Sequence, residues 1–164
     1  IKYYFGDKHS LYETVYKSFI GPPPEKRKNF KTKDTLGQEL EQMFSLMLDP
    51  FTKSIEFKLG RKLHMREQLD PMGLWKNDIE NEIKPKHNEI ISLIKKEVKG
   101  ISDDDANRLL FSIVSLSIGI FVNQDVILAI NEKLINEENS LVIWKKRLTK
   151  YALAMIEVEK KLRK

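Results

Sequence analysis

The stretch Leu109–Val122, LLFSIVSLSIGIFV, decides the fold of this chain because it carries no charged residue. Its large apolar side chains are interrupted only by Ser112, Ser115, Ser117 and Gly119. A helix that is apolar on every face has to be covered on every face, by its own domain or by a second copy of the protein. The stretch therefore predicts a central helix in a helical domain that uses cover from another subunit.

The composition of the whole chain agrees with a helical protein. Of its 164 residues, 41% are hydrophobic and 32% charged, with few Gly and Pro, so we expect an all-α fold without strands. The absence of Cys excludes disulfides and Cys-based metal sites and fits a reducing cytoplasm. The central apolar run is shorter than the 18 or so residues of a typical membrane span, so we expect a cytoplasmic protein that does not enter a membrane.

Apolar residues recur at spacings of three and four along most of the chain, which predicts a series of amphipathic helices. The helices are expected at 7–20, about 35–49, about 52–69, about 74–83, about 85–98, about 103–122, 126–135 and about 139–162. Pro85 is expected either to kink a helix or to begin the next one in its first turn. The expected capping residues are Asp7, Asp34 or Thr35, Ser102, and Asn139 or Ser140 at helix starts, and Gly100 at a helix end.

A proline-rich, basic segment separates the start of the chain from its body. Gly21 and Pro22–Pro24 interrupt the helical pattern, and EKRKNFKTK at 25–33 then places five basic residues against one Glu. Such a patch suits a polyanion such as nucleic-acid phosphate, and it also suits a solvated linker. We expect three parts: a DNA-binding remnant with a connecting helix at 1–20, a linker at 21–33, and a helical domain at 34–164.

The first residues, IKYYFGDKHSL at Ile1–Leu11, resemble the end of the helix-turn-helix in the tetracycline-repressor (TetR) family. The resemblance implies that Phe5 and Leu11 are core residues. It also implies that the chain begins inside the recognition helix, so that specific DNA binding belongs to the complete protein. The residues implied as DNA contacts are Lys2, Tyr3, Tyr4 and Lys8. Tyr hydroxyls and Lys ammonium groups can donate to phosphate, although the tyrosines could equally be surface aromatics.

The body of the chain resembles the C-terminal domain of the CecR branch of that family. The resemblance is carried by MREQLDP at Met65–Pro71 and EIKPKHNEII at Glu82–Ile91. It implies a dimeric helical domain that senses a small molecule, joined to a helix-turn-helix that binds an operator. The implied function is a ligand-responsive transcriptional regulator, with repression as the expected mode.

Soft and aromatic side chains lie near the central helix in sequence and suit an adaptable effector pocket. The candidate ligand-binding residues are Met43, Met47, His64, Met65, Trp75, Phe111, Ser115 and Ile118. Ordinary core packing is the alternative for the methionines. For His64, Arg66 and Glu67, the alternatives are a buried polar network and groups that orient a ligand.

The two longest predicted helices, at 103–122 and 139–162, are expected to pair with their copies in a second subunit as a four-helix bundle. The candidate interface residues are Leu116, Phe121, Trp144, Leu148, Tyr151 and Met155. Three scattered His residues form no convincing ligand set, so we expect no metal, no cofactor and no enzymatic activity. A helical dimerisation or carrier module without a DNA role is the alternative function.

Overall fold

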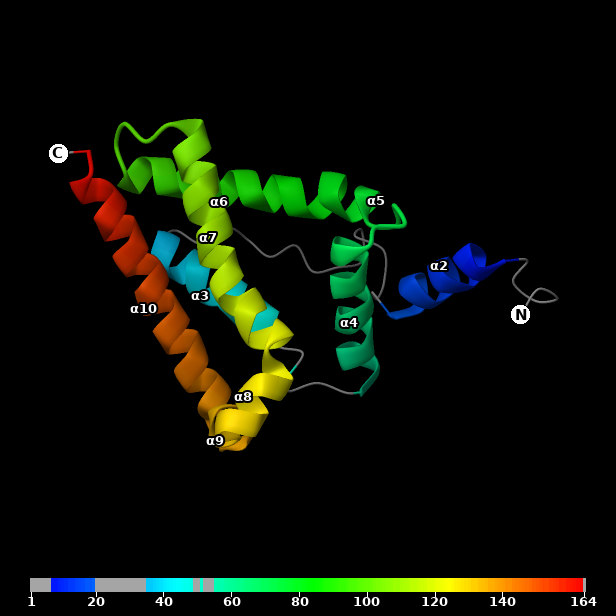
Figure 1. Cartoon of the computed structure of the whole chain (residues 1–164). Helices are drawn as coiled ribbons and strands as arrows, with labels where there is room; N and C mark the ends of the chain where they lie inside the picture. The colour runs from blue at the N-terminus through cyan, green and yellow to red at the C-terminus, as the bar shows by residue number, and fades with distance from the viewer. Residues whose placement is uncertain (1–6, 20–34, 49–50, 52–54, 164) are drawn as a thin grey trace. The chain divides into compact units, whose positions relative to one another are not determined.

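A computed structural model describes residues 7–19, 35–48, 51 and 55–163, and these residues form helices and connecting turns without a strand (Figure 1). The predicted all-α fold is therefore confirmed. The elements are α2 (Lys8–Phe19), α3 (Leu36–Leu48), α4 (Ile55–Leu69), α5 (Lys76–Asp78), the π-helix η3 (Ile79–Ile83), α6 (Lys84–Glu97), α7 (Asp103–Val122), α8 (Gln124–Asn131), α9 (Lys133–Asn136) and α10 (Ser140–Lys161).

The chain divides into two compact units, which we describe separately. Unit 1 comprises residues 1–30 and 52–86, and unit 2 comprises residues 31–51 and 87–164. Among the described elements, unit 1 contains α2, α4, α5, η3 and the first residues of α6, while unit 2 contains α3, the rest of α6 and α7 to α10. The division into 1–20, 21–33 and 34–164 made from the sequence stays a prediction.

Three predicted helix starts have the expected side-chain caps. Asp7 Oδ1 accepts a hydrogen bond from the backbone N–H of Ser10 at 2.8 Å, and Thr35 Oγ1 accepts one from Gln38 at 3.3 Å. Ser102 Oγ accepts from the N–H of Asp105 at 3.1 Å at the start of α7. Each cap satisfies a donor that the first helical turn leaves without a backbone partner, so these predictions are confirmed.

The start of α10 differs from the prediction. Asn139 precedes the helix in the left-handed conformation, with a φ of 66°, and its side chain makes no capping hydrogen bond. Ser140 Oγ instead donates to the carbonyl oxygen of Ile135 at 2.7 Å. The predicted side-chain cap at either residue is therefore wrong, because Ser140 is used to tie α10 back to the preceding turn.

The segment expected as one helix at 126–135 is two short helices, α8 and α9. The break lies at Glu132, between Asn131 and Lys133. Asn131 Oδ1 accepts a hydrogen bond from the backbone N–H of Lys133 at 3.3 Å. A side chain that binds a nearby backbone donor competes with the helical hydrogen-bond ladder, which explains why the helix is interrupted here.

Pro85 lies in the first turn of α6, directly after the π-helix η3. The backbone N–H of Lys84 donates to the carbonyl oxygen of Ile79, five residues earlier, which is the π-helical register. A proline supplies no N–H, and this change of register immediately precedes it. Further on, Gly100 has a φ of 78° after α6, as expected for a helix-ending glycine in the left-handed region.

The core of unit 2 lies between α3, α6, α7 and α10 (Figure 1). Its most deeply buried large side chains are Leu40, Phe44, Ile94, Leu110, Ile113 and Ile156. Burying one such side chain contributes about 1.5 to 3 kcal/mol relative to leaving it exposed. One face of α7 thus belongs to the core, and this packing holds α3 and α10 beside it.

Candidate functional site

The predicted DNA-contact residues cannot be placed. Lys2, Tyr3 and Tyr4 lie outside the described residues. Lys8 is the first residue of α2, and its side chain also lies outside the described part of the chain. The basic segment at 25–33 lies outside it as well, so the DNA-contact assignments stay predictions.

The predicted ligand-binding residues fall into both units. Unit 1 contains His64, Met65 and Trp75, whereas unit 2 contains Met43, Met47, Phe111, Ser115 and Ile118. In unit 2, Ser117 Oγ approaches the sulfur of Met47 to 3.0 Å, and Met43 packs against the hydrophobic core. Met43 thus packs against the core and Met47 contacts α7, which fits the alternative of core packing for these residues.

The outer face of α7 carries three of the remaining candidates. Phe111 is 62% exposed and Ser115 is also exposed, while Ile118 is half-buried. At 100° per residue, these positions lie opposite the buried face that contains Ile113. Phe111 and Ser115 thus face away from the core of unit 2, and their assignment to an effector pocket stays a prediction.

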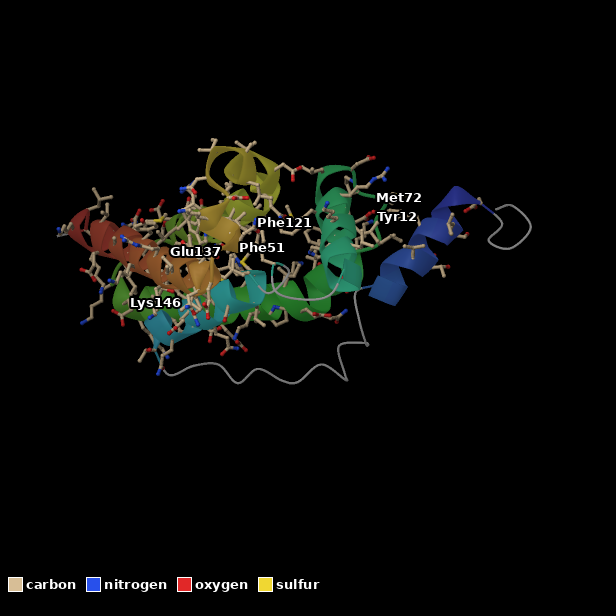
Figure 2. The ribbon with its side chains drawn as sticks, turned by 90° about the horizontal axis from the view of Figure 1, so that it is seen from below. Tyr12, Phe51, Met72, Phe121, Glu137 and Lys146 are labelled. Carbon is tan, nitrogen blue, oxygen red and sulfur yellow. The ribbon has the colours of Figure 1, made fainter. Side chains whose placement is uncertain are left out.

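The predicted interface residues occupy different environments. Leu148 is only 3% exposed and belongs to the core of its own chain, so it has no surface left for a second subunit. Phe121 packs edge-on against Phe51, with ring centroids 5.9 Å apart (Figure 2). Leu116 and Met155 are half-buried against the same core. These contacts lie within one chain, and the assignment of the half-buried residues to a subunit interface stays a prediction.

Trp144 and Tyr151 complete the predicted set. The indole N–H of Trp144 donates to the carbonyl oxygen of Leu134 at 2.7 Å, which ties α10 to α9. Tyr151 is 48% exposed and is the member of the set that presents substantial surface. It belongs to an exposed stripe on α10 whose members repeat every three or four residues: Ile143, Arg147, Tyr151, Ala154, Val158 and Leu162.

The α7 helix also carries an apolar outer stripe, formed by Phe111, Ser115, Ile118 and Val122. By length and composition α7 is able to cross a membrane, a test that core helices of soluble proteins also pass. Since the opposite face of α7 packs in the core of unit 2, the stripe is one exposed side of a folded domain. The sequence predicted that this helix needs cover all round, and among the described residues much of its outer face is exposed.

Unit 1 contains a buried carboxylate beside aromatic side chains. Glu67 on α4 is fully buried, and its Oε1 accepts a hydrogen bond from the backbone N–H of Leu74 at 2.7 Å. Its Oε2 is also buried and has no hydrogen-bond partner among the described residues. The ring of His64, one turn earlier on α4, lies edge-on to Trp75 with centroids 4.7 Å apart. Glu67 is thus a half-satisfied carboxylate next to the α4–α5 turn.

Tyr12 on α2 belongs to the same group and was not among the predicted site residues. Its hydroxyl donates to the carbonyl oxygen of Leu63 at 3.4 Å, and the Arg66 guanidinium lies 5.7 Å from its ring centroid. Burial raises the pKa of Tyr12, and the nearby charge of Glu67 raises it further. Figure 2 shows Tyr12 on the side of α2 that faces α4. Its place next to Leu11 on the apolar face was the sequence signal for this contact.

No three or more His, Asp or Glu residues come together in the described part of the chain in a way that could hold a metal ion.

Comparison of the sequence with models of known protein families shows to which family the chain belongs. The family model for the C-terminal domain of the HTH-type transcriptional dual regulator CecR matches residues 36–157. The chain belongs to this family. The match to the CecR C-terminal domain runs from the first residue of α3 into α10, and it confirms the resemblance seen at Met65–Pro71 and Glu82–Ile91. No curated protein and no solved structure matches the chain. A CecR C-terminal domain is part of a transcriptional regulator of the TetR type.

Proposed function

We propose that this chain is the sensing and dimerisation part of a DNA-binding transcriptional repressor that responds to a small molecule. The observation that carries the proposal is the match of a regulator's C-terminal domain to residues 36–157, which includes α3 and α7 and most of α10. The proposal assigns the chain no catalytic step and no cofactor. It places the complete regulator in the cytoplasm, where operator DNA is accessible.

Dimerisation is supported by the exposed stripes on α7 and α10, which are largely apolar and include one charged residue, Arg147. Phe111, Val122, Val158 and Leu162 are each more than half exposed. Contiguous apolar surface of this kind is uncommon on monomers and typical of protein interfaces. A two-fold axis that brings α7 and α10 against their copies would cover both stripes with one self-complementary surface. The proposed partner is therefore a second copy of this chain.

DNA binding is proposed for the complete regulator. A two-fold dimer presents two recognition helices about 34 Å apart, or a multiple of it, which matches palindromic half-sites. In this proposal Lys2, Tyr3, Tyr4 and Lys8 contact phosphates and fix the orientation of the recognition helix. An effector that prefers one dimer geometry shifts the operator affinity by its differential binding energy, typically about 1 to 3 kcal/mol.

The proposal is tested with the complete regulator and fragmented genomic DNA at physiological salt. Retained fragments are sequenced, and the expected result is enrichment of a palindromic site. Retention without sequence preference, or no retention, contradicts the regulator proposal and favours the carrier module considered from the sequence. Salt has to be held fixed in this comparison because non-specific binding depends steeply on it.

A further inference from the structure

Glu67 on α4 is fully buried in unit 1, and the hydrogen bonding of its carboxylate is incomplete among the described residues. One oxygen receives the N–H of Leu74 at 2.7 Å, and the other is buried without a hydrogen-bond partner among the described residues. A buried carboxylate is stable only when its oxygens receive donors or a counter-charge. Oε2 therefore lacks a donor among the described residues.

Two polar side chains of the same group, Tyr12 and Arg66, make other contacts. The Tyr12 hydroxyl donates to the carbonyl oxygen of Leu63, and Arg66 is exposed with its guanidinium over the Tyr12 ring. Neither group forms a hydrogen bond or an ion pair with Glu67. The missing partner of Oε2 is therefore a donor from outside the described residues of this unit.

Aromatic side chains contact α4 about one turn before Glu67. Trp75 directly follows Leu74, the residue whose N–H binds Glu67, and its indole meets the ring of His64. The Tyr12 hydroxyl reaches the carbonyl oxygen of Leu63, one turn before Glu67 on α4. Trp75, His64 and Tyr12 are each only partly buried, so the group reaches the surface of unit 1. Aromatic faces attract cations, Trp most strongly, and repel anions.

We propose that Glu67, Trp75 and Tyr12 form a binding site for an organic ammonium cation, whose N–H group donates to Oε2 of Glu67. A protonated amine satisfies both requirements of the site, a hydrogen-bond donor and a positive charge beside aromatic rings. A neutral ligand supplies at most the donor, and an anion supplies neither. The inference deepens the proposed function, on which it rests for its regulatory meaning, by naming the chemical class of the effector.

The site is connected to the helix that would report ligand binding. Tyr12 lies on α2, and α2 begins at Lys8, one of the predicted phosphate contacts. A cation held between Glu67 on α4 and Tyr12 on α2 therefore contacts both helices. Ligand binding there biases the packing of α2 on α4 within unit 1.

The test uses the whole chain with Trp144→Phe, which leaves Trp75 as its one tryptophan. Three probes of similar shape are titrated: phenethylammonium, the neutral 3-phenylpropanol and the anionic 3-phenylpropionate. We expect a saturable change of Trp75 fluorescence with phenethylammonium, and binding of the other two weaker by about ten-fold or more, the size of one charge-assisted hydrogen bond. Equal binding of all three probes, or no saturable binding of the ammonium probe, overturns the inference.

Glu67→Gln is the decisive variant because its amide oxygen can still accept from Leu74 N–H while the negative charge is lost. It is expected to weaken phenethylammonium binding by about ten-fold or more with an unchanged circular dichroism spectrum. Glu80→Gln is the matched control, since Glu80 is an exposed carboxylate of unit 1 that pairs with Lys84. Unchanged affinity in Glu67→Gln, or equal losses in both variants, contradicts the site. These titrations need no DNA, so their failure is separate from a failure of the DNA retention assay.

Discussion

Ser102 and Asp105 are joined by two hydrogen bonds at the start of α7. Ser102 Oγ accepts from the backbone N–H of Asp105 at 3.1 Å, and the Ser102 hydroxyl donates to Oδ2 of Asp105 at 2.9 Å. The same carboxylate accepts a hydrogen bond from Arg163, two residues after the end of α10, at 3.0 Å. The capped start of α7 thus also binds the segment that follows α10.

Ser102→Ala removes the cap and is expected to lower the free energy of unfolding by about 1 kcal/mol. Urea denaturation followed by circular dichroism measures the change. Ser112→Ala is a suitable control, because Ser112 is exposed within α7 and its hydroxyl only binds back to the carbonyl of Arg108. Equal effects of the two variants would show that the cap contributes nothing of its own.

Asp105 gives the start of α7 a defined pH dependence. Its hydrogen bonds from Ser102 and then from Arg108 lower its pKa below the ordinary 3.8. Because the folded pKa is lower than the unfolded one, the charged form stabilises the fold above pH 3.8, and this stabilisation is lost as the pH falls through the folded pKa. As the pH falls below 3.8, the free energy of unfolding should therefore decrease less in Asp105→Asn than in the parent chain. Parallel curves for the two would contradict this assignment.

Leu148→Ala tests the correction that this residue is core. We expect a loss of about 2 to 5 kcal/mol in unfolding free energy, because the substitution leaves a cavity among buried side chains. Lys146→Ala, two residues earlier and exposed, should change the stability by less than about 0.5 kcal/mol. A Leu148→Ala chain of full stability that dissociates into monomers would return Leu148 to the interface.

Lys8→Ala in the complete regulator tests the proposed phosphate contact. The affinity of the regulator for operator and for non-operator DNA should fall by a similar factor. The slope of log affinity against log salt should become smaller in magnitude by about one unit. Lys146→Ala serves as a control for loss of one positive charge elsewhere. A loss confined to the operator sequence would instead indicate that Lys8 contacts a base.

The sequence predicted most helix boundaries because local chemistry sets them. Asp7, Thr35, Ser102 and Gly100 act on backbone groups within a few residues of themselves, so their roles could be inferred from position alone. The start of α10 could not, because Ser140 is engaged by Ile135 and not by its own helix. The outcome there depends on how the chain turns after α9.

The candidate site was harder to predict because periodicity does not say which apolar face is covered. Phe111 and Ile113 are two residues apart on α7, yet one is 62% exposed and the other fully buried. The apolar run alone could not rank these faces. Tyr12 was missed for a related reason, since its contact with Leu63 joins segments 51 residues apart in sequence.

The central claim is that a second copy of the chain covers α7 and α10. Sedimentation equilibrium tests it most directly, on the parent chain, the Tyr151→Glu variant and the Lys146→Glu control. Tyr151 is on the exposed α10 stripe, whereas Lys146 is exposed elsewhere on the same helix (Figure 2). We expect the parent chain and Lys146→Glu to have the mass of two chains. Tyr151→Glu should have the mass of one chain, with an unchanged circular dichroism spectrum, because the new charge in the interface has no partner. A parent chain with the mass of one at micromolar concentration, or a Tyr151→Glu variant that stays a dimer, would contradict the claim.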